Sequence, residues 1–174
     1  TVDVLSGFEA DVMAEALERI EAGTRNLAYP ETVVGPGQEP GTDVPFLNLA
    51  VGTQLGWGAP GRKHSTHEMF RVDNKGSVLD GNRGTFSVTT SEPPVGGLWS
   101  VTVYDTARGG FLHPNVANRH HINNTSAVKN ADGTVTFLFK RSCTDADKNC
   151  LEVPPGPFDL ATRYYLPKAE ILNG

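Results

Sequence analysis

Two cysteines, Cys143 and Cys150, have the clearest chemistry in this chain. They flank a short, mostly polar loop, and two free thiols this close in sequence would be unusual, so we expect a disulfide. On the chain-entropy model, closing so short a loop stabilises a protein by about 2.5 kcal/mol. Because disulfides persist in oxidising compartments, the pair predicts a periplasmic, lumenal or secreted protein.

Acidic residues within this loop suggest calcium as a second possibility. Asp145, Asp147 and Asn149 alternate along the chain like the first ligands of a calcium-binding loop. The pattern then fails, because a cysteine stands where glycine is needed and Gly156 stands where a bidentate glutamate is needed. Two interpretations remain: a weak calcium site that also uses Glu152, or a solvated turn held by the disulfide, which the pattern favours.

Histidines occur in two pairs that resemble metal ligands. On a helix, His64 and His67 would share a face and, with Glu68 beside them, could hold a transition metal. Glycine and proline precede this segment, so we expect a solvated loop. His120 and His121 are adjacent, and adjacent residues of a strand point to opposite faces. No metal site and no cofactor are predicted.

Catalytic signatures are missing from the sequence. It contains no GxSxG elbow, phosphate-binding P-loop, HExxH helix or paired CxxC motif. No catalytic residue is therefore predicted. Asn123 and Asn124 begin overlapping glycosylation sequons, which matter only if the source is eukaryotic and the chain is secreted.

Composition limits the classes of protein to consider. A chain of 174 residues with 38% hydrophobic and 20% charged residues fits one folded domain, neither membrane-spanning nor disordered. The net charge of -5 and the lack of a basic cluster disfavour nucleic acid as a partner. The 19 glycines and 12 prolines indicate many turns and therefore short strands. The chain starts at Thr1, which leaves open whether a leader was cleaved.

The first 45 residues have a helical pattern followed by a connector. Residues 6–29 predict an amphipathic helix capped by Ser6 and Glu9. Its apolar stripe would contain Phe8, Val12, Met13, Ala16, Leu17 and Ile20. Residues 30–43, rich in Gly, Pro and Glu, predict an exposed connector, and residues 46–57 predict a shorter helix.

From Glu68 onward the pattern alternates with a period of two, which is typical of strands with one buried face. Strands are predicted at residues 68–72, 85–90, 99–103, 135–139 and 158–165, with a hairpin turn at residues 132–133. Among the side chains of these strands, Val88 is expected to face the core, and Ser100 and Thr102 are expected on the solvent side, opposite Trp99. Strands separated by turns rather than helices predict an antiparallel β-sandwich in residues 46–174, an α+β but mainly β fold. One or two N-terminal helices would pack at one end or on one face.

Four segments carry a resemblance to a known family. The sequences PPVGGLWSVTVYD (93–105), NRHHI (118–122), NADGTVTFLFK (130–140) and PPGPFDLATRYYLPK (154–168) occur in the order and at similar spacing to those of domain-of-unknown-function family twelve-fourteen. The chain resembles this family from about Phe46 to Gly174. The resemblance implies a jelly-roll-like sandwich and the C-terminal module of a two-part bacterial envelope protein, with no settled activity. His120 and Cys150 depart from the aromatic residue and the tryptophan of the family.

The resemblance also identifies candidate site residues. Arg119 and Arg163 match the two arginines of the family motifs, and Asp105 matches the acid that closes the WSVT strand. One interpretation is an Arg–Asp network that braces strand ends, because a lone buried guanidinium is costly. The other is a pocket for an anion or sugar, flanked by Tyr104, Tyr165 and Trp99, since the guanidinium binds carboxylates bidentately.

Two functional hypotheses follow from these observations. The first is a non-catalytic module that binds a partner protein or a small ligand, as an accessory subunit of a larger assembly. The alternative is a hydrolase or lyase for a small anionic or sugar substrate, which requires Arg119, Arg163 and Asp105 to converge in one pocket.

Overall fold

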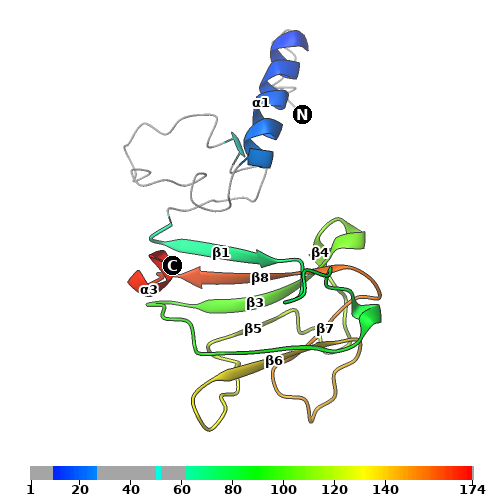
Figure 1. Cartoon of the computed structure of the whole chain (residues 1–174), viewed down its shortest axis with the longest axis vertical. Coiled ribbons are helices and arrows are strands. Elements are labelled where there is room, and N and C mark those ends of the chain that lie inside the picture. Colours follow the sequence, from blue (N-terminus) through cyan, green and yellow to red (C-terminus); the bar gives the residue numbers. More distant parts are fainter. Residues whose placement is uncertain (1–9, 27–49, 52–61, 174) are drawn as a thin grey trace. The chain divides into compact units, whose positions relative to one another are not determined.

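The computed structural model describes residues 10–26, 50–51 and 62–173 (Figure 1). The chain divides into two compact units, Thr1–Arg62 and Lys63–Gly174. The predicted domain boundary between residues 45 and 46 lies outside the described residues and stays a prediction.

The first unit contains one long described helix, α1 (Ala10–Asn26). It confirms the predicted helix over these residues, whereas the proposed cap at Ser6 and the connector at residues 30–43 lie outside the described residues. Of the second predicted helix only Ala50 and Val51 are described, and both are helical. Among the described helices, none has the length and apolar composition needed to cross a membrane.

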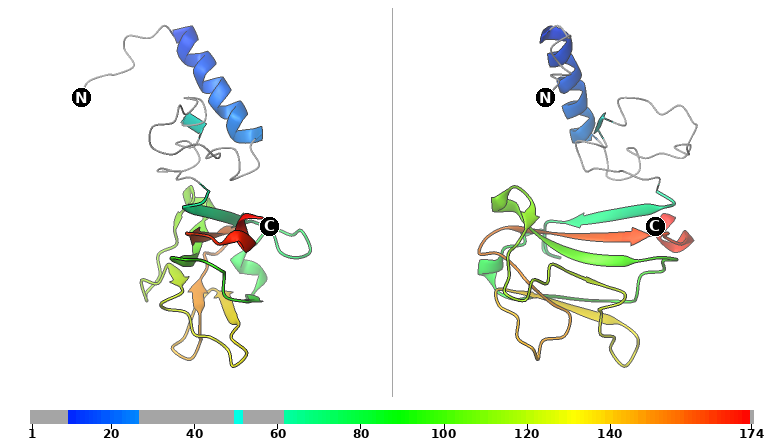
Figure 2. Two further views of the ribbon diagram at one scale, coloured as in Figure 1. Left: turned by 90° about the vertical axis from the view of Figure 1, so that its left-hand side faces the viewer. Right: turned by 180° about the vertical axis from the view of Figure 1, so that it is seen from behind.

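The second unit contains two β-sheets, which form separate layers (Figures 1 and 2). In the first sheet, β1 (Ser65–Phe70), β8 (Phe158–Tyr165) and β3 (Trp99–Asp105) pair in that order, all antiparallel. The other edge of β3 pairs with two short strands, β5 (His121–Asn123) and β4 (Phe111–Leu112). The central strand β3 therefore has neighbours on both sides along most of its length.

The second sheet has three strands in the order β2 (Phe86–Thr90), β6 (Val135–Lys140) and β7 (Cys150–Glu152). β2 pairs with β6 antiparallel, but β6 and β7 run parallel. The mainly β, two-sheet architecture confirms the predicted fold, with this parallel pair as a departure from an all-antiparallel sandwich. The jelly-roll connectivity stays a prediction.

Short helical turns complete the unit. These are the 3-10 helices η1 (Gly81–Arg83) and η2 (Thr106–Arg108) and the terminal α3 (Ala169–Leu172). The side chain of Asp80 caps η1 by accepting a hydrogen bond from the backbone N–H of Asn82, at 2.8 Å. Such a cap satisfies a donor that has no partner within the helix.

Apolar residues of both sheets meet between the layers. Alternate residues of β3 and β6 are buried there, as the period-two pattern predicts, and Trp99 is only 1% exposed. Its indole packs edge-on against Phe137, with ring centroids 5.9 Å apart. Phe86 and Phe158 make a similar contact at 5.6 Å, which joins the two sheets. The core consists of Leu79, Trp99, Val101, Val103, Ile122, Val135, Phe137, Phe139, Leu151, Val153, Phe158 and Leu160.

Three local expectations need correction. His67 lies in strand β1 rather than in a loop, because the strand begins at Ser65, before its predicted start at Glu68, and pairs with β8 over its whole length. Val88 was expected in the core but is 47% exposed, because β2 is an edge strand. Ser100 and Thr102 were expected to face solvent, yet both are buried.

Candidate functional site

The outer face of the first sheet contains the polar cluster that could bind a ligand. Strand register decides its members, because residues paired across neighbouring strands point to the same face. Arg163 of β8 lies between His67 of β1 and Ser100 of β3. Thr102 and Tyr104 of β3 have the same parity as Ser100 and therefore share this face.

Arg163 is half-buried, and its guanidinium is held by hydroxyl groups and an aromatic ring. Nη2 donates to the hydroxyl of Tyr104 at 2.7 Å, and Nη1 donates to the hydroxyl of Thr102 at 3.4 Å. The guanidinium carbon lies 5.4 Å from the centroid of the Tyr104 ring, within the range of a cation–π interaction. These contacts orient the guanidinium but leave its charge unneutralised.

No carboxylate of the described residues forms an ion pair with Arg163. Asp159, the acid of β8 on the same face, instead pairs with Arg71, with Nε and Oδ2 3.4 Å apart. A partly buried cation without a counter-ion is unfavourable, since burial removes water without supplying an opposite charge. The uncompensated charge of Arg163 therefore favours the binding of an anion that is not part of this sheet face.

The charged form of the histidine beside Arg163 is disfavoured. Burial, and then the charge of Arg163, lower the pKa of His67 below its usual value of 6.5. A neutral imidazole can donate or accept a hydrogen bond without a second positive charge. The cluster therefore places a fixed cation beside an imidazole whose protonation is disfavoured.

Asp105 lies apart from this cluster, on the opposite face of the sheet. It is adjacent to Tyr104 in β3 and pairs with the core residue Phe158. Its carboxylate is buried, with Oδ2 3.7 Å from Nδ1 of His113, while Oδ1 has no hydrogen-bond partner. Since Asp105 and Arg163 point to opposite sides, the expected single pocket of Arg119, Arg163 and Asp105 does not form, and neither does an Arg163–Asp105 brace.

The remaining candidates lie at the ends of the strands. Arg119 is exposed in the connection before β5, where its backbone N–H donates to Asn115 Oδ1 at 2.8 Å. Tyr165 is an exposed residue at the end of β8, beside Ser65. Of the five predicted ligand-binding residues, the structure brings only Arg163 and Tyr104 into contact.

The predicted disulfide between Cys143 and Cys150 is present, with 5.9 Å between the Cα atoms. In the loop that it closes, Asp147 Oδ2 accepts hydrogen bonds from the backbone and hydroxyl of Thr144 and lies 2.6 Å from Lys140 Nζ. Lys140 and Thr144 lower the pKa of Asp147 to about 2. These partners occupy the carboxylate that calcium would need, and the described residues contain no cluster of ligands for a metal ion.

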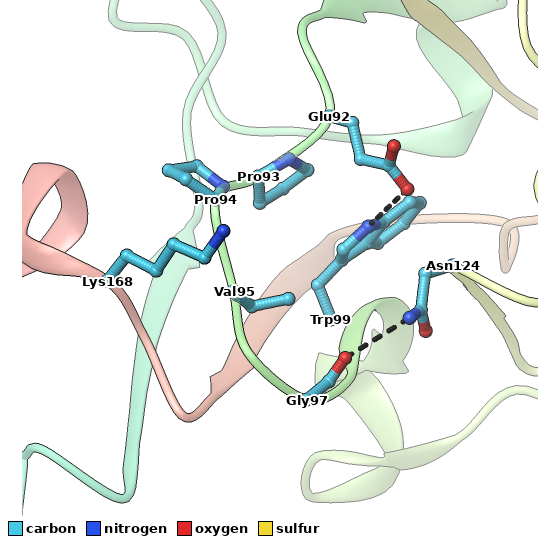
Figure 3. A pocket seen from close by; sticks show the side chains of 8 residues that line it. All are labelled: Glu92, Pro93, Pro94, Val95, Gly97, Trp99, Asn124 and Lys168. Carbon is cyan, nitrogen blue, oxygen red and sulfur yellow. Dashed lines mark hydrogen bonds between the residues drawn. The ribbon is translucent and has the colours of Figure 1, made fainter.

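A separate hollow of about 350 Å³ lies at the start of β3 (Figure 3). Trp99 Nε1 donates to Glu92 there, at 3.4 Å, and Lys129 also bonds the glutamate and lowers its pKa. The Asn124 amide donates to the carbonyl of Gly97 at 3.2 Å. The hollow is lined by Glu92, Pro93, Pro94, Val95, Gly97, Trp99, Asn124 and Lys168.

Sequence reasoning missed His67 and Thr102 as neighbours of Arg163. Both lie on strands that are distant in sequence from residue 163, and only the β1–β8 and β3–β8 registers place them beside it. The alternation within each strand shows which of its residues share a face. Which residues of neighbouring strands lie side by side depends on the pairing register, which the sequence does not give.

Comparison with known proteins identifies relatives without an assigned activity. The family model described as "Protein of unknown function (DUF1214)" matches residues 65–169. The crystal structure of the VPA0106 protein from Vibrio parahaemolyticus superposes with a TM-score of 0.74 at 23% identity, and the match covers 95% of this chain and 43% of that one. A putative uncharacterized protein from Burkholderia cenocepacia gives a TM-score of 0.41 at 10% identity, over 92% and 46% of the two chains. No curated protein matches.

The chain thus spans less than half the length of the Vibrio protein. At this identity the likeness applies to the fold alone.

Proposed function

Since the chain belongs to the DUF1214 family, for which no activity is described, we propose a function from its own site: a non-catalytic module that binds a carboxylate or phosphate group through Arg163. The group belongs either to a small anionic ligand or to an acidic segment of a partner protein. Both sources offer the same chemistry to a planar guanidinium, which binds such groups through two parallel hydrogen bonds.

The observation that supports this proposal is the half-buried guanidinium without a counter-ion. Tyr104 and Thr102 use two of its N–H donors and hold the group in one orientation. The donors that remain make no hydrogen bond to any residue that the structure describes. A preorganised donor loses little conformational entropy when a ligand binds, which favours affinity.

Binding rather than catalysis is proposed because the cluster lacks a general acid–base pair. The acid that an Arg/Asp hydrolase would need, Asp105, faces the core. We also propose an oxidising compartment, periplasmic, lumenal or secreted, which the Cys143–Cys150 disulfide supports.

The test is thermal unfolding with three probes at constant ionic strength: succinate, inorganic phosphate and hexaglutamate. A ligand that binds only the folded state at one hundred times its Kd stabilises by about 2.7 kcal/mol. We expect a rise in Tm with at least one probe, and the probe that acts distinguishes a small ligand from an acidic peptide.

Variants show whether the effect depends on Arg163. Arg163→Gln should abolish the rise, Arg163→Lys should restore it only partly, and Arg141→Gln, which removes an exposed arginine elsewhere, should leave it unchanged. If all four proteins respond alike, or the wild type responds to none of the probes, Arg163 does not bind anions and the proposal is wrong.

A further inference from the structure

The connection between β3 and β5, residues 106–120, exposes three large apolar side chains. Phe111 is 70% exposed, Leu112 is 42% exposed and Val116 is fully exposed. The connection leaves the end of β3, forms η2 and β4 (the light-green lobe at the right of Figure 1) and returns to β5. Single exposed apolar residues are common, but three in one short connection indicate an interaction surface.

This connection is held in place by hydrogen bonds rather than left loose. Nδ1 of His120 lies within hydrogen-bond distance of the carbonyl oxygen of His113, at 3.1 Å. Oδ2 of the buried Asp105 lies 3.7 Å from Nδ1 of His113, which is beyond hydrogen-bond distance. Asn115 bonds both backbone groups of Arg119, at 2.8 and 3.0 Å. Val116 therefore protrudes from a closed turn, and its exposure is a property of the fold.

The charge of the connection is opposite to that of the chain. The protein has a net charge of -5, yet residues 106–131 contain no aspartate or glutamate. Arg108 and Arg119 are exposed and form no ion pair with any described residue. A positive region on an acidic protein attracts an anionic surface and orients the molecule toward it.

We propose that residues 106–120 bind the surface of an anionic lipid bilayer. Phe111 and Leu112 stand out from the short strand β4 and Val116 from the turn that follows it, which suits insertion into the headgroup and acyl boundary, while the arginines contact lipid phosphates. A preformed protein interface would instead offer a packed apolar patch or groove. This surface lies outside the Arg163 cluster, so the two proposals are independent.

The test measures cosedimentation of the whole chain with vesicles of phosphatidylcholine alone or mixed with phosphatidylglycerol. We expect binding to the mixed vesicles, weak binding to phosphatidylcholine, and loss of binding at high salt. Each arginine near an anionic membrane contributes about fivefold in affinity, so Arg108→Gln/Arg119→Gln should weaken binding about 25-fold.

The apolar contribution is tested by Phe111→Ser/Val116→Ser, which should weaken binding by about tenfold or more. Two matched double variants serve as controls. Val72→Ser/Val78→Ser removes exposed valines from another hairpin, and Lys75→Gln/Lys148→Gln removes exposed cations elsewhere. Both controls should bind like the wild type.

A tryptophan in place of Phe111 reports insertion directly. The fluorescence of Phe111→Trp should shift to shorter wavelength with mixed vesicles and should be quenched by lipids brominated in the acyl chains. The proposal is overturned if the wild type binds neither vesicle, or if the serine variant binds like the wild type. Phe111-dependent binding of hexaglutamate without vesicle binding would assign the surface to an acidic protein and would also overturn it.

Discussion

Reduction of the Cys143–Cys150 disulfide should destabilise the protein without unfolding it. The loop that the disulfide closes is also held by Lys140 and Thr144, which both bond Asp147. These contacts remain in the reduced folded state. The disulfide therefore acts mainly on the unfolded chain, whose conformational freedom it restricts.

The size of the effect follows from the loop length. With a sequence separation of 7, the chain-entropy model gives about 2.5 kcal/mol. Unfolding a domain of about 110 residues, the length of the unit Lys63–Gly174, has an entropy of roughly 0.24 kcal/mol/K. Dividing the first value by the second gives a fall in Tm of about 10 °C.

The assay is calorimetry with and without a phosphine reductant, with the free thiols counted by mass spectrometry after alkylation. Cys143→Ala/Cys150→Ala serves as the control, and its Tm should not respond to the reductant. A fall of less than about 3 °C in fully reduced wild type would show that the unfolded chain gains little freedom and would refute the reasoning. Free thiols in protein isolated without reductant would contradict the proposed oxidising compartment.

Three further predictions concern other contacts. Asn149→Ala should lower the free energy of unfolding by about 2–4 kcal/mol in urea titrations, because the buried Asn149 side chain makes three hydrogen bonds that join β6 to a loop; a loss below about 0.5 kcal/mol contradicts this. The folded-state pKa of Asp147, about 2, lies below the unfolded value near 3.8, so the stability that this carboxylate contributes is complete above pH 3.8 and is lost as pH falls through 2. The Tm difference between the wild type and Lys140→Gln should therefore shrink from pH 5 to pH 2. A Tm difference that stays constant over this range would contradict the role of Asp147. Tyr104→Phe removes the hydroxyl that orients Arg163 but keeps the ring, so it should weaken the probe response about tenfold, by loss of one charge-assisted bond; an unchanged response would show that the hydroxyl is unimportant.

Much of the core could be predicted because the alternation of apolar and polar residues within a strand shows which of its faces is buried. Val135, Phe137 and Phe139 alternate with polar residues and are buried as expected. The same pattern was misleading in β3, where Ser100 and Thr102 read as solvent-facing residues but are buried. Alternation distinguishes the two faces of a strand, but it does not reveal whether the second face is also covered.

For the candidate site, the sequence predicted some of the residues but not which of them lie together. The sequence identified Arg163 and Tyr104 as candidates, and they are in contact. It also grouped them with Asp105, although a residue adjacent to Tyr104 in a strand must point the other way. The grouping came from motif resemblance, which gives the identity of residues but not the face on which they lie.

The sequence alone located the five longest of the eight strands, the disulfide and the residue types that could carry charge-based recognition, because these depend on local periodicity and short spacing. The short strands β4, β5 and β7 were not predicted. Only the tertiary structure decided that His67, Thr102 and Arg163 share a face, that β6 and β7 run parallel, and that Asp105 is turned toward the core. Each of these depends on hydrogen bonds between strands far apart in the chain, and register is a property of the pair rather than of either strand.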